Sequence, residues 1–360
     1  MDSKSFFRPF LLFFLFQLLL GGCVRRNPIA ENGASSGAHR GVVNLAVWSN
    51  YIPQEVIQNF ERQSGIKVRV SHYSSNEELL AKIQTGSSEY DLVVPSDYMV
   101  FVMIKLGLLH ALDYSQLASS KFIDAKFLKK AYDPENKYSV PYDWGTTGIA
   151  INHALYPGEV RSWKDLLEKT DLAGKISLLD DARELIGAAL KSLGYSMNST
   201  RMTELLQAKQ LLLKNKARVK TFTSEPLMAL LNGEVAVSQI YMSDALQVRK
   251  LRGDQIEYVV PAEGGTLWID NLVIPAHAQH VKEAHQFLSF LLEPQSNAET
   301  VKSVWVAPAN REVFKLLPEA YQKNHLLFPA SSVLARCEMI QDLGSFISEW
   351  DRIWTEFKAL

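Results

Sequence analysis

Short apolar runs alternate with helix-like segments from residue 42 onward, and this alternation constrains the fold more than any other feature. Residues 42–47, 66–70 and 91–94 are predicted strands, because each is apolar and bounded by turn or cap residues. The helices that follow them are expected to begin at Pro53, at Ser75 or Asn76, and at Ser96 or Asp97. Six alternating elements within about sixty-five residues favour a parallel sheet with helices on both faces.

A second block with the same alternation begins at residue 175. Its strands are predicted at 175–179, 235–240, 256–260 and 268–274, and its helices at 183–193, 203–214, 243–250, 281–292, 295–304 and 345–357. Between the blocks, residues 141–148 permit bending and are flanked by strand-like segments. We therefore predict two α/β lobes that are joined by extended crossovers and close around a cleft by a hinge motion.

The start of the chain indicates export. A short basic start precedes an apolar run at 10–20 with a single polar residue, which is too short for a permanent membrane helix. The run ends in Leu20-Gly21-Gly22-Cys23, which resembles the lipobox of bacterial lipoproteins. This resemblance implies a signal peptide at 1–22 and a lipid on Cys23, and residues 23–41 read as a flexible tether without an apolar period. A buried apolar helix at the N-terminus is the alternative interpretation.

Composition removes several classes of function. The formal net charge is −1 and 47% of the residues are hydrophobic, which is ordinary for a soluble fold and gives no reason to expect a nucleic-acid partner. The chain beyond residue 42 is long enough for one large or two medium domains. Its only cysteine there is Cys337, so with Cys23 acylated no disulfide forms and packing must stabilise the globule.

No catalytic or metal-binding constellation stands out in the sequence. The G-x-S-x-G, H-E-x-x-H, P-loop and G-x-G-x-x-G motifs are all absent. His277 and His280 are three residues apart and can chelate a metal, but a surface loop before a helix is the better interpretation. We therefore expect no enzyme activity, no cofactor and no metal site.

Aromatic and acidic side chains gather instead at the ends of predicted strands. The candidates after or within five strands are Trp48, Ser49, Asn50, Tyr51, Ser96, Asp97, Tyr98, Asp180, Asp181, Glu184, Tyr241, Asp244, Trp268 and Asp270. Glu184 follows Asp181 by one helical turn, so both can face one cleft. Taken singly, the acids are also good helix N-caps and the tryptophans good core residues. Their shared placement at strand ends favours a binding site.

The combination of acids and rings points to an organic cation. Carboxylates attract cations, and aromatic faces stack on alkyl chains and attract ammonium groups for about 0.5–2 kcal/mol each. A buried charge-assisted hydrogen bond adds about 1.5–3 kcal/mol, and each methylene removed from water about 0.8 kcal/mol. A polyamine, charged at intervals and apolar between, suits such a cleft. A sugar needs fewer acids, and an anion is repelled by them.

Four stretches resemble the bacterial spermidine/putrescine-binding proteins of ABC transporters. They are Trp48-Ser49-Asn50-Tyr51-Ile52-Pro53, the stretch 90–98 (YDLVVPSDY), the stretch 179–184 (LDDARE) and the stretch 263–270 (EGGTLWID). The likeness runs from about residue 42 to the C-terminus. It implies the two-lobed periplasmic-binding-protein fold (type II) with a hinge of crossing strands. We assign 42–145 and 271–314 to lobe 1, and 146–270 and 315–360 to lobe 2.

The resemblance also implies roles for individual residues. Trp48, Tyr51 and Trp268 would box the carbon chain, Tyr241 stands where the family usually has a third tryptophan, and Ser96 and Tyr98 would line the first lobe. Asp181, Glu184 and Asp270 match acids that hold the amines, and Asp244 matches an acid of the putrescine-preferring members. Ser49 and Asn50 complete the predicted site. The implied partner is a membrane permease, reached by a monomer that is anchored through Cys23 in the periplasm or cell envelope.

Three positions depart from the family pattern. Asn50 replaces a common acid, Val306 replaces a tyrosine, and Ile340 stands for a glutamine, for which Gln341 can compensate after a shift of one residue. These departures leave open which polyamine is preferred.

Three other functions remain possible at this stage. Ferric iron is the first, because related receptors use clustered tyrosines, although Tyr51, Tyr98 and Tyr241 are dispersed along the sequence. A secreted hydrolase with Asp181 and Glu184 as an acid/base pair is the second. A structural or sensory lipoprotein without a transported ligand is the third.

Overall fold

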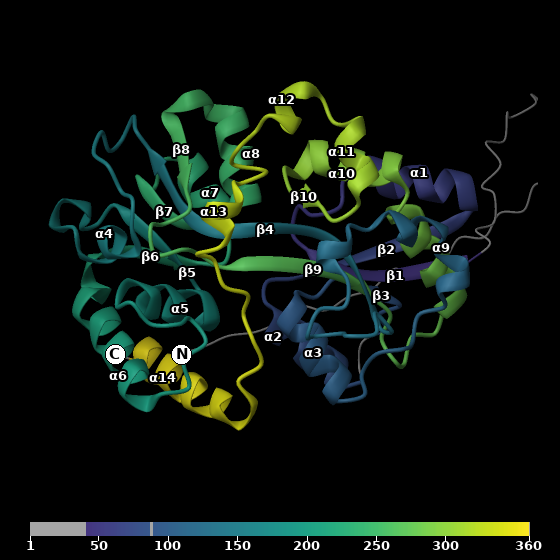
Figure 1. Cartoon of the computed structure of the whole chain (residues 1–360), viewed down its shortest axis with the longest axis horizontal. Coiled ribbons are helices and arrows are strands. Elements are labelled where there is room, and N and C mark those ends of the chain that lie inside the picture. Colours follow the sequence, from purple (N-terminus) through teal and green to yellow (C-terminus); the bar gives the residue numbers. More distant parts are fainter. Residues whose placement is uncertain (1–40, 87–88, 360) are drawn as a thin grey trace, which may run out of the picture. The chain divides into compact units, whose positions relative to one another are not determined.

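A computed structural model describes residues 41–86 and 89–359. The predicted signal peptide at 1–22, the lipidated Cys23 and nearly all of the tether at 23–41 lie outside the described residues. Within the part that is described, the chain forms a mixed α/β structure around a sheet with the strand order β2-β1-β3-β9-β4-β7-β5-β6. Two further strands, β8 and β10, pair with β4 outside this order (Figure 1).

The first block folds largely as its pattern predicts. Its elements are β1 (Gly41–Trp48), α1 (Gln54–Ser64), β2 (Ile66–Tyr73), α2 (Asn76–Gln84), β3 (Leu92–Val93) and α3 (Asp97–Lys105). The strands β2 and β3 both run parallel to β1, which lies between them. Ser75 is the cap of α2, because its hydroxyl accepts a hydrogen bond from the Glu78 N–H at 3.1 Å. Pro53 precedes α1 as its N-cap instead of being its first residue, since its ψ of 140° is extended.

The second block contains three elements that the sequence pattern did not reveal, the helix α4 and two that bear on the functional site. Its strands are β5 (Ile176–Leu179), β6 (Val219–Thr223), β7 (Val237–Tyr241) and β8 (Ile256–Val259); its helices are α4 (Trp163–Glu168), α5 (Ala182–Ser192), α6 (Met202–Asn215), α7 (Pro226–Leu231) and α8 (Met242–Arg252). The strand β6 and the helix α7 were not predicted. Both matter below, because the loop that joins them reaches the functional site.

Two long strands connect the blocks, and they correct the expectation of a purely parallel sheet. The strand β4 (Ser139–Asn152) pairs antiparallel with β9 (Leu267–Val273) along its first half. Its second half pairs antiparallel with β7 and β8. Residues 141–148 are therefore part of one buried strand, irregular only between Pro141 and Asp143, as expected of an extended crossover. They stay extended because β4 has strand partners on both of its edges. Figure 1 shows β4 and β9 running side by side between the two sets of helices.

The C-terminal part of the chain returns to both blocks. Its elements are α9 (Val281–Leu291), α10 (Pro294–Val304), β10 (Ala307–Pro308), α11 (Arg311–Leu316), α12 (Glu319–Gln322), α13 (Ser331–Leu334) and α14 (Ile347–Ala359). The helix α9 packs on β1, whereas α14 packs on α5 and α6. Trp350 and Phe357 of α14 are fully buried there.

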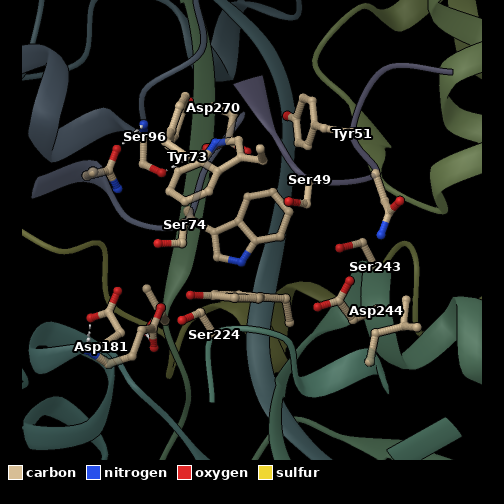
Figure 2. A pocket seen from close by; sticks show the side chains of 18 of the residues that line it. Ser49, Tyr51, Tyr73, Ser74, Ser96, Asp181, Ser224, Ser243, Asp244 and Asp270 are labelled. Carbon is tan, nitrogen blue, oxygen red and sulfur yellow. Dashed lines mark hydrogen bonds between the residues drawn. The ribbon is translucent and has the colours of Figure 1, made fainter. Parts of the chain in front are cut away.

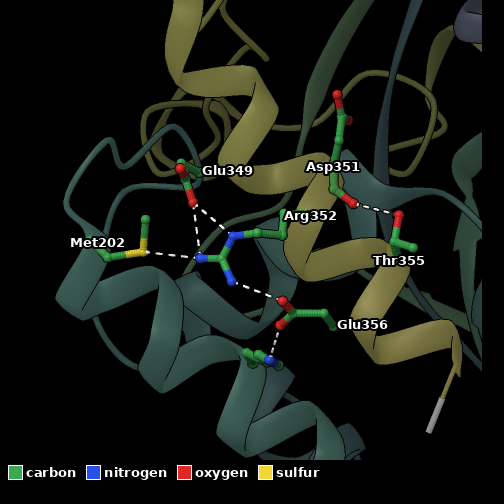
Figure 3. A network of polar contacts seen from close by, with 7 residues as sticks. Met202, Glu349, Asp351, Arg352, Thr355 and Glu356 are labelled. Atoms are coloured by element: carbon green, nitrogen blue, oxygen red, sulfur yellow. Dashed lines mark hydrogen bonds and ion pairs between the residues drawn. The ribbon is translucent and has the colours of Figure 1, made fainter.

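An ion-pair network on the exposed side of α14 reinforces this packing (Figure 3). Arg352 donates to Glu349 at 2.9 Å and to Glu356 at 2.8 Å, one turn away on either side. Glu356 also pairs with Lys209 of α6. The network therefore ties the last helix of the chain to the second block.

Candidate ligand-binding site

A cavity in the described part of the chain encloses about 1030 Å³ of empty space that opens to solvent (Figure 2). All of the predicted ligand-binding residues line it. They are Trp48, Ser49, Asn50, Tyr51, Ser96, Tyr98, Asp181, Glu184, Tyr241, Asp244, Trp268 and Asp270. They come from the ends of β1, β3, β5 and β7 and from β9, so the expected convergence of strand ends is seen.

The cavity is strongly acidic. Its carboxyl groups are those of Asp97, Asp181, Glu184, Glu225, Asp244 and Asp270. Among the described residues, no lysine, arginine or histidine lines it. Six carboxyl groups that face no basic side chain across the cavity create an electric field that attracts cations and repels anions.

Glu184 is held rigidly between the two connecting strands. Asp181 caps α5 by accepting the Glu184 N–H at 2.9 Å, which places Glu184 in the first helical turn. The Glu184 carboxylate accepts hydrogen bonds from the hydroxyls of Thr147 at 2.9 Å and Thr266 at 2.6 Å. Burial, and then the charge of Asp181, raise the pKa of Glu184 to about 8. Glu184 thus lies in the first turn of α5 and also lines the cavity.

Asp270 lies on β9 and also lines the cavity. Its Oδ1 accepts a hydrogen bond from the Ser96 hydroxyl at 2.8 Å. Burial raises the pKa of Asp270 to about 6, and the Ser96 hydrogen bond opposes this rise. Trp268 lies two residues earlier on the same face of β9 and also lines the cavity, as the alternation predicts.

A third acidic position forms at α8. Asp244 lies in the first turn of α8, and burial followed by the charge of Glu225 raises its pKa to about 7. Figure 2 shows Asp244 and Asp181 on opposite sides of the cavity with Ser224 between them. The acids are therefore spread along the cavity and not gathered at one point.

Aromatic rings cover much of the remaining wall. The Trp48 ring meets Tyr73 edge-on with centroids 4.6 Å apart, and its Nε1 donates to the Val94 carbonyl at 2.9 Å. The Trp268 ring lies so close to Gly145 that a Cβ at that position would collide with it. The Tyr98 hydroxyl donates to Glu77 at 2.9 Å. Hydrogen bonds and packing thus fix several of these rings.

Several residues of the cavity were missed from the sequence. They are Tyr73, Ser74, Asn76, Ser224, Glu225, Leu227, Ser243, Gln247, Thr266, Val304 and Ile340. Ser224 and Glu225 follow β6, so the unrecognised strand hid them. Asp97 also lines the cavity; it was among the strand-end candidates but was given no role in the predicted site. Tyr73 ends β2, which extends three residues beyond its predicted limit.

Two of the residues that depart from the family pattern, Ile340 and Val306, lie in different surroundings. Ile340 lines the cavity, whereas Gln341 is exposed and does not. The backbone N–H of Gln341 donates to Asn198 at 2.9 Å, and compensation by the Gln341 side chain stays a prediction. Val306 is fully buried in a small apolar cluster with Val301 and Val313.

The ferric-iron alternative can be compared with the geometry of the cavity. Tyr51, Tyr98 and Tyr241 all line the cavity despite their separation in sequence. However, no group of three or more His, Cys, Asp or Glu side chains in the described ranges is placed to hold a metal ion.

No helix among the described residues combines the length and the apolarity that a membrane span requires.

Two half-sheets joined by β4 and β9, with an acidic and aromatic cavity at their strand ends, define a solute-binding protein of the α/β class. Comparison with known proteins specifies the family. Residues 55–329 match the family described as bacterial extracellular solute-binding protein, and the chain belongs to that family.

Individual relatives share most of their length with this chain. The spermidine/putrescine-binding periplasmic protein 1 of Haemophilus influenzae is 34% identical over 344 residues, covering 94% of this chain and 95% of that protein. The spermidine/putrescine-binding periplasmic protein of Escherichia coli is 36% identical over 315 residues, covering 87% and 90%. The structure of the TpPotD lipoprotein of Treponema pallidum has a TM-score of 0.77 at 32% identity and covers 88% of this chain and 99% of its own. The chain has the two-lobed fold of these periplasmic substrate-binding proteins.

Proposed function

We propose that the protein captures a polyamine, spermidine or putrescine, in this cavity and delivers it to an ABC permease. One observation carries the proposal. Six carboxyl groups line the cavity together with several aromatic rings, and none of the described lysine, arginine or histidine residues lines it. A multiply protonated chain satisfies the carboxyl groups, and its methylenes pack on the rings.

The spread of the acids favours a linear guest with separated charges. Asp181 lies at one side of the cavity and Asp244 at the other, and Asp270 projects from β9. A single small cation cannot reach all of these positions at once. The names of the Haemophilus and Escherichia relatives point to the same class of ligand.

The lobe boundaries stay part of this proposal. The two sets of strands meet at β4 and β9, where a small change in backbone angles would open or close the cavity. We place lobe 1 at 42–145 with 271–314, and lobe 2 at 146–270 with 315–360. Glu184, in lobe 2, and Trp48 and Tyr98, in lobe 1, would then close on the same guest.

The lipid anchor is a further part of the proposal. Cys23 follows two glycines at the end of an apolar run, and the Treponema neighbour is named a lipoprotein. We propose that the protein acts as a lipid-anchored monomer in the periplasm or cell envelope. In this place it binds solute without catalysis and meets its permease at the membrane.

Calorimetric titration of the purified protein tests the ligand class. Putrescine, spermidine and cadaverine are compared with arginine, and we expect saturable binding of at least one polyamine and weaker binding of arginine. Arginine carries a carboxylate that the acidic cavity repels. If no polyamine binds or raises the melting temperature, the proposed function is wrong. Ferric iron, added as the citrate complex, is included to test the alternative ligand.

A further inference from the structure

The Glu184 carboxylate receives one hydroxyl hydrogen bond on each of its two oxygen atoms. Thr147 donates to Oε1 at 2.9 Å and Thr266 donates to Oε2 at 2.6 Å. All three side chains are buried, with exposed fractions of 5% or less. Donors on both oxygens fix the plane of the carboxylate, and each oxygen keeps a further lone pair that can accept another N–H.

The two threonines belong to the strands that connect the halves of the sheet. Thr147 lies on β4, Thr266 directly precedes β9, and the Thr147 N–H donates to the Thr266 carbonyl at 3.0 Å. The backbones approach so closely there that a Cβ at Gly265 would lie 2.0 Å from the Thr147 carbonyl oxygen. The first turn of α5 brings Glu184 to the same place. Three elements therefore converge on one carboxylate.

Thr147 and Thr266 differ in their relation to the cavity. Thr266 lines the cavity, whereas Thr147 does not line it and is fully buried. The Thr147 hydroxyl therefore reaches a bound guest only through Glu184. This difference makes Thr147 the cleaner of the two positions for an experiment.

We propose that Thr147 and Thr266 are positioning residues for polyamine binding, whose hydroxyls hold the Glu184 carboxylate in the orientation and the charged form that an ammonium group needs. This inference rests on the proposed polyamine function, with Glu184 as a contact of the guest. A hydroxyl donor stabilises a carboxylate more than a neutral carboxyl group, because hydrogen bonds to charged groups are the stronger ones. The threonines therefore favour the anion that burial disfavours.

The electrostatic surroundings of Glu184 agree with this role. Burial, followed by the charge of Asp181, raises the pKa of Glu184 to about 8, and the hydrogen bonds from Thr266 and Thr147 oppose this rise. The titratable and charged groups that act on Glu184 are Asp97 of α3, Asp181 and Arg183 at the start of α5, Tyr241 of β7 and Tyr258 of β8. Burial raises the pKa of both tyrosines, so their phenols stay neutral from pH 6 to 9.

The variant Thr147→Val removes one hydroxyl with little change in shape. Without this donor the pKa of Glu184 should rise further, so binding of the guest requires a more costly loss of its proton. We expect calorimetric titration of the full chain with putrescine and with spermidine to show about tenfold weaker binding at pH 7. At pH 9 the loss should shrink to about twofold, because most of the ionisation cost has then disappeared. Each loss is a ratio of two proteins with the same guest, so changes in the guest's own charge cancel.

Thr146→Val is the matched control. Thr146 is the neighbouring residue on β4 and is also fully buried, but its hydroxyl forms a hydrogen bond with the Tyr258 hydroxyl at 2.9 Å, and it does not line the cavity. Both valine variants lose one buried hydrogen bond, so both should lower the melting temperature of the ligand-free protein by a similar amount. Polyamine affinity of Thr146→Val should stay within about twofold of the wild type at both pH values. Thr147→Ser keeps a hydroxyl and should restore wild-type affinity to the same degree.

A double variant tests whether Thr147 acts through Glu184. In the Glu184→Gln background, Thr147→Val should change the affinity at pH 7 by less than about twofold, because no carboxyl group remains to be ionised there. If Thr147→Val does not fold, Thr147→Ala removes the same hydroxyl and replaces it in every measurement.

The outcomes separate the inference from the function. An affinity of Thr147→Val within about twofold of the wild type at pH 7 overturns the role of the threonines while the proposed function stands. An affinity loss that is equal at pH 7 and pH 9, that persists in the Glu184→Gln background, or that Thr147→Ser does not repair assigns Thr147 a packing role and overturns the inference equally. A wild-type protein that binds no polyamine overturns both.

Discussion

Polyamine affinity should rise steeply as the pH increases from 6 to 8. Three of the cavity acids have pKa values raised to between about 6 and 8: about 6 for Asp270, about 7 for Asp244 and about 8 for Glu184, with burial as the main cause in each case. A protonated acid cannot neutralise an ammonium group, whereas aliphatic amines stay protonated throughout this range. Binding therefore requires these groups to lose protons, and raising the pH removes that cost.

The size of the effect follows from the pKa values. At pH 6, the free-energy cost of ionising Glu184 lowers the affinity by about a hundredfold, and the cost of ionising Asp244 lowers it by about tenfold. At pH 8, only the cost of ionising Glu184 remains, and it lowers the affinity by about twofold. If all three acids contact the guest, affinity rises by up to about a thousandfold between pH 6 and 8. If Asp244 contacts the guest and Glu184 does not, ionisation of Asp244 alone raises the affinity about tenfold between pH 6 and 8.

Stability of the ligand-free protein should change in the opposite direction. The pKa of Glu184 is raised to about 8 in the folded state, so its contribution to stability is full below the ordinary value of 4.5. That contribution is lost as the pH rises through 8, because the buried group must then ionise. The same pH change thus weakens the empty protein and strengthens its complex.

Calorimetry at several pH values, in buffers with different ionisation enthalpies, measures both the affinity and the protons released. We expect close to one or more protons released per ligand at pH 7. The variant Glu184→Gln is the control, and its affinity should be weaker at pH 8 but nearly constant between pH 7 and 8. A wild-type affinity that changes less than threefold from pH 6 to 8, without proton release, refutes the reasoning.

Three further predictions concern the acids, the rings and the anchor. Asp270→Asn should weaken polyamine binding by at least tenfold, since about 1.5–3 kcal/mol of charge-assisted hydrogen bonding is lost, whereas the exposed Asp254→Asn should leave the calorimetric affinity unchanged. Gly145→Ala should displace the Trp268 ring and weaken binding by about fivefold at an estimated 1 kcal/mol, with a shift in tryptophan emission; unaltered emission and affinity would contradict this. Cys23→Ser should move the protein from the membrane fraction to the soluble fraction without changing its polyamine affinity, and continued membrane retention would contradict the lipid anchor.

The sequence predicted the positions of most strands because their apolar runs are short and well bounded. Residues 42–47 became β1 and 256–260 became β8 with shifts of one residue or so at the ends. The strand β6 was missed because its sequence, VKTFT, alternates weakly and no residue in it is fully buried. Residues 141–148 contain a proline and glycines that permit bending, and the predicted extended crossover forms there because strand partners on both edges keep them extended.

The cavity was predictable where a strand end marks it, and less so elsewhere. Trp48, Asp181 and Asp270 were found because acids and rings follow or occupy strands in a repeated way. Ser224 and Glu225 could not be found without β6. Neither could the sequence show that Thr147 and Thr266 hold Glu184, because that contact depends on how β4 and β9 lie against α5.

The rings and acids of the cavity answer different parts of the selectivity problem. Acids alone would also attract hydrated metal ions, but a hydrated ion gains nothing from the Trp48 and Trp268 faces and prevents them from packing on carbon. Rings alone would accept neutral aromatic or sugar ligands, but such a guest would leave Glu184 and Asp244 to be desolvated without a counter-charge. Only a guest that is apolar along its length and positively charged at intervals satisfies both sets of groups at once, so selectivity follows from their alternation in one cavity.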